Sequence, residues 1–187
     1  MEFSVDALRR AGKRMSKVLR RCLPSVYYVL SCLCVFTAVL ALFISFYRPC
    51  VVHGTSMAPT LQGGDQVLLS CKSNPERGDI VAVRRDDEVP LIKRVIAVEG
   101  DTVYIHPQDG TVLVNGAVLE EPYIQGSTPQ KELLGEITIP KGKLFVLGDN
   151  RATSHDSRYK DIGLIAVEDI VGVAVFRFAP LSKLGGL

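Results

Sequence analysis

Histidine is scarce in this chain, which holds only three: His53, His106 and His155. A Ser-His-Asp triad needs one of them beside an activated serine. His155 stands between a serine and an aspartate, but neighbouring residues of an extended chain point to opposite sides. We therefore interpret the three as surface or structural residues. His53 stays open as a base, because it lies three residues before Ser56.

Recognisable metal-binding and phosphate-binding patterns are also missing. The five cysteines form no Cys-x-x-Cys pair, and no His, Cys and carboxylate cluster has zinc spacing. Residues 149–151 do not continue as a calcium loop, and Gly148 lies in no phosphate-binding motif. We expect no metal and no organic cofactor. A disulfide between Cys50 and Cys71 stays open.

Charged residues are absent from 24–47, a run of 24 residues that is apolar in most positions. As a helix the run is about 36 Å long, enough to cross a hydrocarbon core of about 30 Å. No other stretch is long enough. A cleaved signal peptide has an apolar region of about 7–15 residues, so we expect an uncleaved anchor in the lipid bilayer.

Positive charge is concentrated on one side of this run. Residues 1–23 carry seven Lys/Arg against two acidic residues, and the remaining 15 basic and 18 acidic residues have a net charge of −3. Because a basic flank is retained in the cytoplasm, we expect a single-pass plasma-membrane protein. Its predicted parts are a cytoplasmic tail (1–23), an anchor (24–47) and one domain on the outer face (48–187). The mildly acidic domain argues against nucleic-acid binding.

Long stretches of helical periodicity are lacking after the anchor. Short runs rich in Val and Ile predict strands at 66–71, 79–84, 91–98, 102–106, 111–115, 117–120, 143–147 and 170–178. Asn115-Gly116 indicates a two-residue hairpin, a helical turn is expected near 168–170, and the polar segment 121–134 is expected to be a loop. The predicted fold class is mostly β, an antiparallel β domain after one N-terminal transmembrane helix.

Four segments contain the candidate chemistry: Gly54–Leu61 (GTSMAPTL), Gly78–Val81 (GDIV), Lys93–Asp101 (KRVIAVEGD) and Gly148–Arg158 (GDNRATSHDSR). Together, in this order and after an N-terminal span, they resemble the bacterial type I signal peptidases, serine proteases with a Ser–Lys dyad. The resemblance covers the chain from the anchor to about Phe178. The small size and single span are similar to the short Gram-positive form.

The resemblance implies roles for individual residues. Ser56 corresponds to the nucleophile, Lys93 to its general base, and Ser154 to a hydroxyl that orients the lysine amine. Four charged residues correspond to groups that hold the site in shape: Asp149, Asp156, Arg94 and Arg158. Some relatives have an oxyanion-supporting serine two residues before the nucleophile. Here that residue is Gly54, which leaves the oxyanion to backbone N–H groups, chiefly that of Ser56, or to Thr55.

The chemistry of a Ser–Lys pair sets a condition on Lys93. A lysine amine has an ordinary pKa of about 10.4 and is protonated at neutral pH, but burial among apolar groups lowers that pKa. Lys93 lies within the apolar run 89–98, a plausible setting for a desolvated amine. A lysine in a strand more often lies at an edge or rim. The four segments together favour the catalytic interpretation.

The implied substrates are secretory preproteins with small residues, in an Ala-x-Ala-like pattern, before the cut. Ser56 follows the anchor by nine residues, at most about 30 Å of extended chain, so we expect it near the bilayer and the secretion translocon. An extended peptide is expected to pair with open strand edges beside Ser56 and beside the Lys93 strand. Met57 and Pro59 are expected at the substrate or membrane side, with Met57 exposed.

Other interpretations stay open within and outside this chemistry. A dedicated processing peptidase, for pilins or for one secreted substrate, would use the same dyad. An organellar relative is disfavoured by the acidic Glu2 and Asp6 in the leader. A catalytically inactive, membrane-anchored binding domain is a further alternative. The anchor and the lack of a DNA-binding module disfavour a soluble self-cleaving repressor.

Overall fold

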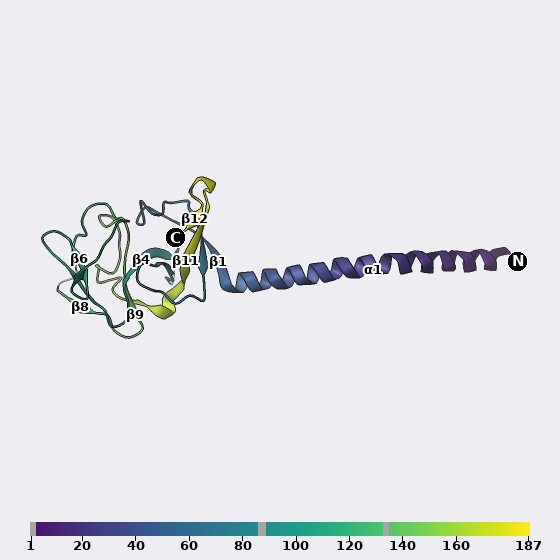
Figure 1. Ribbon diagram of the computed structural model, residues 1–187, viewed down its shortest axis with the longest axis horizontal. Coiled ribbons are helices and arrows are strands. Elements are labelled where there is room, and N and C mark those ends of the chain that lie inside the picture. Colours follow the sequence, from purple (N-terminus) through teal and green to yellow (C-terminus); the bar gives the residue numbers. More distant parts are fainter. Residues whose placement is uncertain (1–2, 86–88, 133–134) are drawn as a thin grey trace. The chain divides into compact units, whose positions relative to one another are not determined.

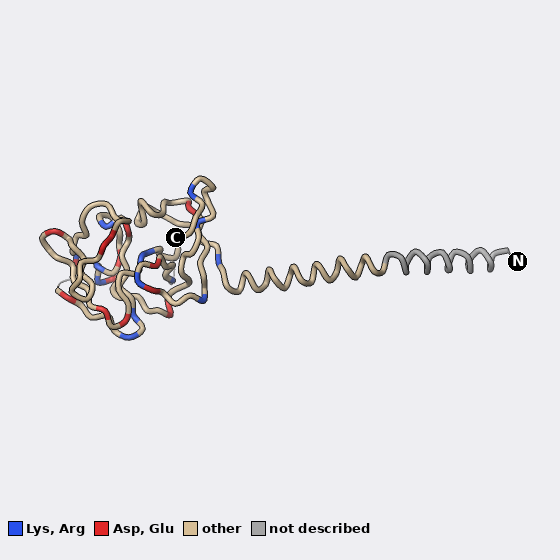
Figure 2. The backbone as a smooth tube through the Cα atoms, viewed as in Figure 1, with Lys and Arg blue, Asp and Glu red and all other residues tan. Residues whose placement is uncertain are grey.

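The structure, a computed structural model, describes residues 3–85, 89–132 and 135–187, with side chains from Leu23 onward. The chain divides into a helical unit, Met1–Ser45, and a β unit, Phe46–Leu187. Within helix α1 (Phe3–Phe46), the segment Leu23–Phe46 is long and apolar enough to cross a membrane. Figure 2 shows no charged residue between the start of this segment and the β unit. These features fit a single-pass membrane protein.

The β unit contains two antiparallel sheets (Figure 1). The larger has the order β1-β2-β11-β3-β4-β9-β10, with β12 paired to β11, and the smaller has the order β7-β6-β5-β8. The strands are β1 (Tyr47–Val51), β2 (Gln66–Ser70), β3 (Ile80–Val83), β4 (Leu91–Ala97), β5 (Thr102–Ile105), β6 (Val112–Val114), β7 (Ala117–Val118), β8 (Ile137–Thr138), β9 (Lys143–Leu147), β10 (Ile165–Ala166), β11 (Ile170–Ala179) and β12 (Gly185–Gly186).

The mostly β fold predicted from the sequence is confirmed, and each predicted strand is present with small shifts at its ends. The Asn115-Gly116 turn joins β6 to β7 with positive φ at both residues, as a two-residue hairpin requires. The predicted helical turn is a 3-10 turn at Val167–Asp169. Four strands were not predicted: β1, β8, β10 and β12. Three of these have two residues, and β1 begins at Tyr47, which the sequence had placed in the anchor.

Met57 is a core residue, so the expectation that it is exposed is wrong. Its side chain is 1% exposed and belongs to an apolar cluster with Val52, Leu61 and Val67. Pro59, two residues on, is exposed, as expected of a residue at the surface. The pattern of this loop is therefore apolar side chains turned inward, with the polar Ser56 left half-buried at its rim.

The register of β1 and β2 answers the question of a Cys50–Cys71 disulfide. Cys50 lies opposite Val67, whereas the Cys71 backbone N–H bonds to the carbonyl of Phe46. Val67 and Cys71 are four residues apart, about 13 Å along a strand, and a disulfide requires Cα atoms within about 7 Å. Both thiols are free.

The burial of Met57 generates a stability prediction. Met57→Ala should lower the free energy of unfolding by about 2–5 kcal/mol, because it leaves a cavity in a closed apolar cluster. Leu181→Ala is the matched control, since Leu181 is 82% exposed, and should change stability by about 0.5 kcal/mol or less. Denaturant titration of the full chain in detergent measures both. Equal effects would contradict the core assignment.

Candidate active site

Ser56 and Lys93 are brought together by the fold. Ser56 lies in the turn after β1, and Lys93 lies in β4, 37 residues further along the chain. The Lys93 Nζ donates a hydrogen bond to the Ser56 Oγ over 2.9 Å. Ser56 is half-buried and Lys93 is 3% exposed. A hydroxyl and a buried amine at this distance can exchange a proton without moving.

The environment of Lys93 favours the neutral amine. Burial lowers the pKa of Lys93 below its ordinary value of 10.5; the charge of Asp156 opposes this shift and that of Arg158 adds to it. The backbone at Lys93 pairs with Val81 of β3, in the middle of the larger sheet. The sheet therefore keeps the amine away from water, which is the condition that a lysine base requires.

The strand of Lys93 is not an edge strand, so the expectation of an open edge along it needs correction. β4 pairs with β3 on one side and with β9 on the other. However, the β9 register covers only Arg94 to Ala97, and 91–93 are paired through β3. β1, which leads to Ser56, is an end strand of the larger sheet. Two open stretches of backbone therefore remain within the described residues. One is 91–93 of β4, which has no partner in β9, and the other is the outer edge of β1.

The loop that carries Ser56 is closed at its base by the backbone. The Val52 N–H donates to the Asp65 carbonyl over 2.8 Å, and the Gly64 N–H donates to the Val52 carbonyl over 2.9 Å. From β11, the Arg177 Nη1 donates to the carbonyl of Thr60 over 2.8 Å and to the Asp65 carboxylate over 3.2 Å. These bonds tie the loop to the larger sheet and limit how far Ser56 can move.

The segment after β9 holds the other side of the same loop. The Asn150 N–H donates to the Ser56 carbonyl over 2.9 Å, and its side-chain amide donates to the Thr55 carbonyl over 3.2 Å. Gly148 lies so close that a Cβ there would come within 2.2 Å of the Ser154 Oγ and 2.5 Å of the Ser56 carbonyl oxygen. Only glycine fits at this position with its neighbours in place.

The four charged residues implied to shape the site form two buried, two-bond ion pairs. Arg94 donates to both oxygens of Asp149, over 2.8 and 2.6 Å. Arg158 donates to both oxygens of Asp156, over 2.8 and 2.9 Å. Asp156 also accepts the Gly148 N–H over 3.1 Å. Planar two-bond pairs of this kind fix orientation as well as distance.

Ser154 is buried next to Gly148, and its hydroxyl has no hydrogen-bond partner within the described part of the chain. The hydroxyl therefore makes no hydrogen bond to the Lys93 amine in this structure, and the role of Ser154 stays a prediction. Of the histidines that the sequence considered as a base, His155 bonds to Asp161 at the surface, and His53 is exposed. Among the described residues, no group of three or more His, Cys, Asp or Glu side chains is gathered as a metal site.

The sequence did not predict how Arg151, Asn150 and Glu121 contact one another or the rest of the site. Arg151 is fully buried, donates to the Gly148 carbonyl over 3.0 Å, and is paired with Glu121. Asn150 and Gly148 belong to the GDNR motif, so the sequence contained a signal for them without a role. Glu121 lies in the polar segment 121–134, which has no motif that points to the site; 133–134 lie outside the described residues.

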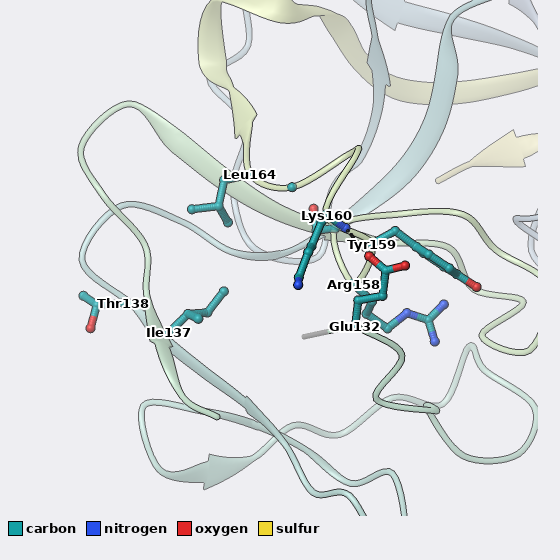
Figure 3. Close-up of a pocket in the computed structure, with 9 residues that line it drawn as sticks. Glu132, Ile137, Thr138, Arg158, Tyr159, Lys160 and Leu164 are labelled. Carbon is teal, nitrogen blue, oxygen red and sulfur yellow. Dashed lines mark hydrogen bonds between the residues drawn. The ribbon is translucent and has the colours of Figure 1, made fainter. Parts of the chain in front are cut away.

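A cavity of about 560 Å³ lies beside the segment that follows Asp156 (Figure 3). Its lining includes Ile137, Lys160 and Leu164 and, among the described residues, neither Ser56 nor Lys93. Arg158 also borders it, with its guanidinium committed to Asp156. The cavity is therefore separate from the dyad.

Comparison with known proteins shows the family of this chain. Residues 25–179 match the family model of the signal peptidases, peptidase S26. Signal peptidase I T of Bacillus subtilis (strain 168) is 36% identical over 165 residues, covering 80% of this chain and 84% of the relative. Probable signal peptidase I-1 of Synechocystis sp. is 35% identical over 164 residues, covering 80% and 81%. A solved signal peptidase I of Enterococcus faecalis V583 aligns at 32% identity and a TM-score of 0.41, covering 54% of this chain and 97% of that chain.

The family model and the two curated relatives define the class of protein as a serine endopeptidase. The chain belongs to the signal peptidase family, peptidase S26.

The close approach at Gly148 generates a prediction for activity. Gly148→Ala should lower kcat by about 100-fold or more, because the added methyl displaces either the Ser56 backbone or Ser154, and misplacement of about 1 Å has that effect. Gly185→Ala is the matched control, since nothing lies within 4 Å of a Cβ there. The test is the turnover of a peptide substrate by both variants, after each has been shown to be folded. An active Gly148→Ala enzyme would show that the packing at Gly148 is dispensable.

The burial of Lys93 generates a prediction on stability and pH. Because the folded state lowers the pKa of Lys93, the unfolded chain binds that proton more tightly. The cost to folding is full below the lowered pKa and disappears as the pH approaches 10.5. Lys93→Met should therefore raise the free energy of unfolding at neutral pH, and this gain should shrink as the pH rises towards 10.5.

Guanidinium titrations of the full chain in detergent, at neutral pH and at about pH 10, measure the gain. Lys143→Met, on the neighbouring strand β9, controls for loss of a lysine that is only partly buried. A gain that is absent at neutral pH, or that grows with pH, would contradict the lowered pKa.

Proposed function

We propose that this protein removes N-terminal signal peptides from exported preproteins, with Ser56 as nucleophile and Lys93 as general base. The observation that supports the proposal is the 2.9 Å contact between the Ser56 Oγ and an amine that is 3% exposed. Membership of the signal peptidase family supports the reaction class, serine endoproteolysis of signal peptides. The assignment of roles to these two residues is the step that needs an experiment.

The proposed reaction proceeds through an acyl-enzyme. The neutral Lys93 amine accepts the Ser56 proton, and the Oγ attacks the scissile carbonyl. Backbone N–H groups, chiefly that of Ser56, donate to the oxyanion, and the Thr55 hydroxyl is an alternative donor. The protonated Lys93 then gives its proton to the leaving amine, the new N-terminus of the mature protein. Lys93 next deprotonates a water, which hydrolyses the ester and releases the signal peptide.

The supporting residues would keep these atoms in line. Asn150 donates to the Thr55 and Ser56 carbonyls, and the bond to Thr55 holds the peptide group that carries the Ser56 N–H. Asp149 and Asp156 are held by Arg94 and Arg158, and we propose that these pairs fix the shape of the site. Ser154, buried beside Gly148, is proposed to orient the amine when Lys93 changes its protonation state. No proposed step requires a metal or an organic cofactor.

Substrate binding is proposed to use the backbone. An extended peptide can add to the free edge of β1 and to the stretch of β4 beside Lys93, with small pockets that accept small residues before the cut. Pro59, exposed in the nucleophile loop, is proposed to face the substrate or the bilayer. With residues 1–23 in the cytoplasm and 48–187 on the outer face of the plasma membrane, Ser56 would stay near the lipid surface and the translocon.

Cleavage of a purified secretory preprotein by the full chain in detergent tests the dyad. Ser56→Ala and Lys93→Ala should each lower the rate by about 10³-fold or more, since the members of a catalytic unit fail together. Lys143→Ala is the control for loss of a lysine outside the site. Mass spectrometry of the products should show one cut after an Ala-x-Ala-like sequence.

Each alternative predicts a different result. Cleavage by Lys93→Ala at the rate of the intact chain would require another base, of which His53 is the candidate left by the sequence. An intact chain that is inert on several preproteins would favour a dedicated processing enzyme or an inactive binding domain.

A further inference from the structure

The aromatic ring of Tyr123, from the segment 121–132, lies over the guanidinium group of Arg94. Its ring centroid is 4.0 Å from the guanidinium carbon of Arg94, and its hydroxyl donates to Glu121 over 3.0 Å. Burial and the neighbouring Glu121 carboxylate raise the pKa of Tyr123 above its ordinary value, so the hydroxyl remains a donor. Tyr123 is half-buried, and no sequence motif points to a role for it or its segment.

Arg94 connects this ring to the chemistry. It follows Lys93 directly in β4, and because successive strand residues point to opposite faces, the two side chains leave the strand on opposite sides. The guanidinium donates to both oxygens of Asp149 and to the carbonyl of Gly78 over 2.8 Å. The Tyr123 ring covers a face of this group, which excludes water from the ion pair and strengthens it.

Asp149 in turn stands between the two residues that contact the nucleophile loop. Gly148 packs against the Ser56 carbonyl, and Asn150 donates to the same carbonyl. A shift of Asp149 is therefore transmitted through its chain neighbours to Ser56. We infer that Tyr123 is a positioning residue for the dyad, acting through Arg94 and Asp149; the inference rests on the proposed function.

The segment around Tyr123 is anchored firmly enough to act in this way. Glu121 accepts two bonds from the fully buried Arg151, one of them over 2.8 Å, and Arg151 also donates to the buried Thr128 over 2.5 Å. Further along, Arg158 donates to the carbonyl of Pro129 over 3.0 Å. The segment is thus held by the same two arginines that reach Gly148 and Asp156.

The test compares two substitutions at Tyr123 in the full chain. Tyr123→Leu removes the ring and should lower kcat for preprotein cleavage by about tenfold with KM little changed, the size expected of one aromatic–cation contact. Tyr123→Phe keeps the ring and loses only the bond to Glu121, so it should restore kcat to within about twofold of the intact chain. Tyr104→Leu, on β5 in the smaller sheet, is the control for loss of a tyrosine elsewhere and should leave kcat unchanged.

A double-mutant cycle shows whether the effect passes through Arg94. Arg94→Lys loses the planar two-bond contact with Asp149. If Tyr123 acts on that contact, adding Tyr123→Leu to Arg94→Lys should lower kcat by much less than tenfold. If Tyr123 had a purely structural role, every Tyr123 variant would have a lower unfolding midpoint. The effects of Tyr123→Leu and Arg94→Lys on kcat would then simply add.

The outcomes separate this inference from the proposed function. An intact chain that cuts, with Tyr123→Leu equally fast or with fully additive effects in the cycle, overturns the inference and leaves the dyad standing. Equal losses in Tyr123→Phe and Tyr123→Leu also overturn it, because the ring is then not the acting group. An intact chain that fails to cut contradicts the proposed function, and the inference falls with it.

Discussion

The structure depends on one physical constraint, the need to bury an amine beside a hydroxyl. A lysine exposed to water is protonated and cannot accept a proton, whereas Lys93 is buried in the larger sheet with its Nζ 2.9 Å from the Ser56 Oγ. The surroundings of the amine within the sheet are apolar and well ordered. They keep the amine from water, but they offer no flexible group that could adjust the distance between the Lys93 Nζ and the Ser56 Oγ. The position of Ser56 must therefore be fixed by the rest of the molecule.

Buried ion pairs and backbone hydrogen bonds hold Ser56 in its position. Three buried or nearly buried ion pairs surround the Gly148–Asn150 segment: Arg94–Asp149, Arg158–Asp156 and Arg151–Glu121. Buried pairs of this kind add little to stability, because desolvation of both ions offsets their attraction. Their planar geometry instead specifies one arrangement of the chain. In this protein that arrangement leaves room for glycine alone at position 148.

Much of the fold and part of the site could be predicted from the sequence. Val- and Ile-rich runs and the Asn115-Gly116 turn are local signals, and they gave the strands and a hairpin correctly. Ser56, Lys93 and the GDNR motif could be recognised because their sequence context is specific. Met57 could not be placed correctly, since an apolar residue beside a polar turn can face either way until the core is known.

The contacts that escaped prediction are those between distant segments of ordinary composition. Tyr123 and Glu121 lie in a polar stretch that resembles any surface loop, and only the folded chain brings them to Arg94 and Arg151. The two-residue strands were missed for a related reason, because their pairing is imposed by neighbours such as β9 and β11 rather than by their own side chains.

The order of these parts along the chain has a consequence for biosynthesis. Ser56 and Lys93 are synthesised early, whereas Asp149 lies 55 residues after the arginine that holds it. A nascent chain that ends before Gly148 contains Ser56 and Lys93 but lacks the segment after β9, with Asp149 and Asp156. The proposed dyad is therefore held in place only after residues 148–158 have been synthesised and have folded against the loop of Ser56.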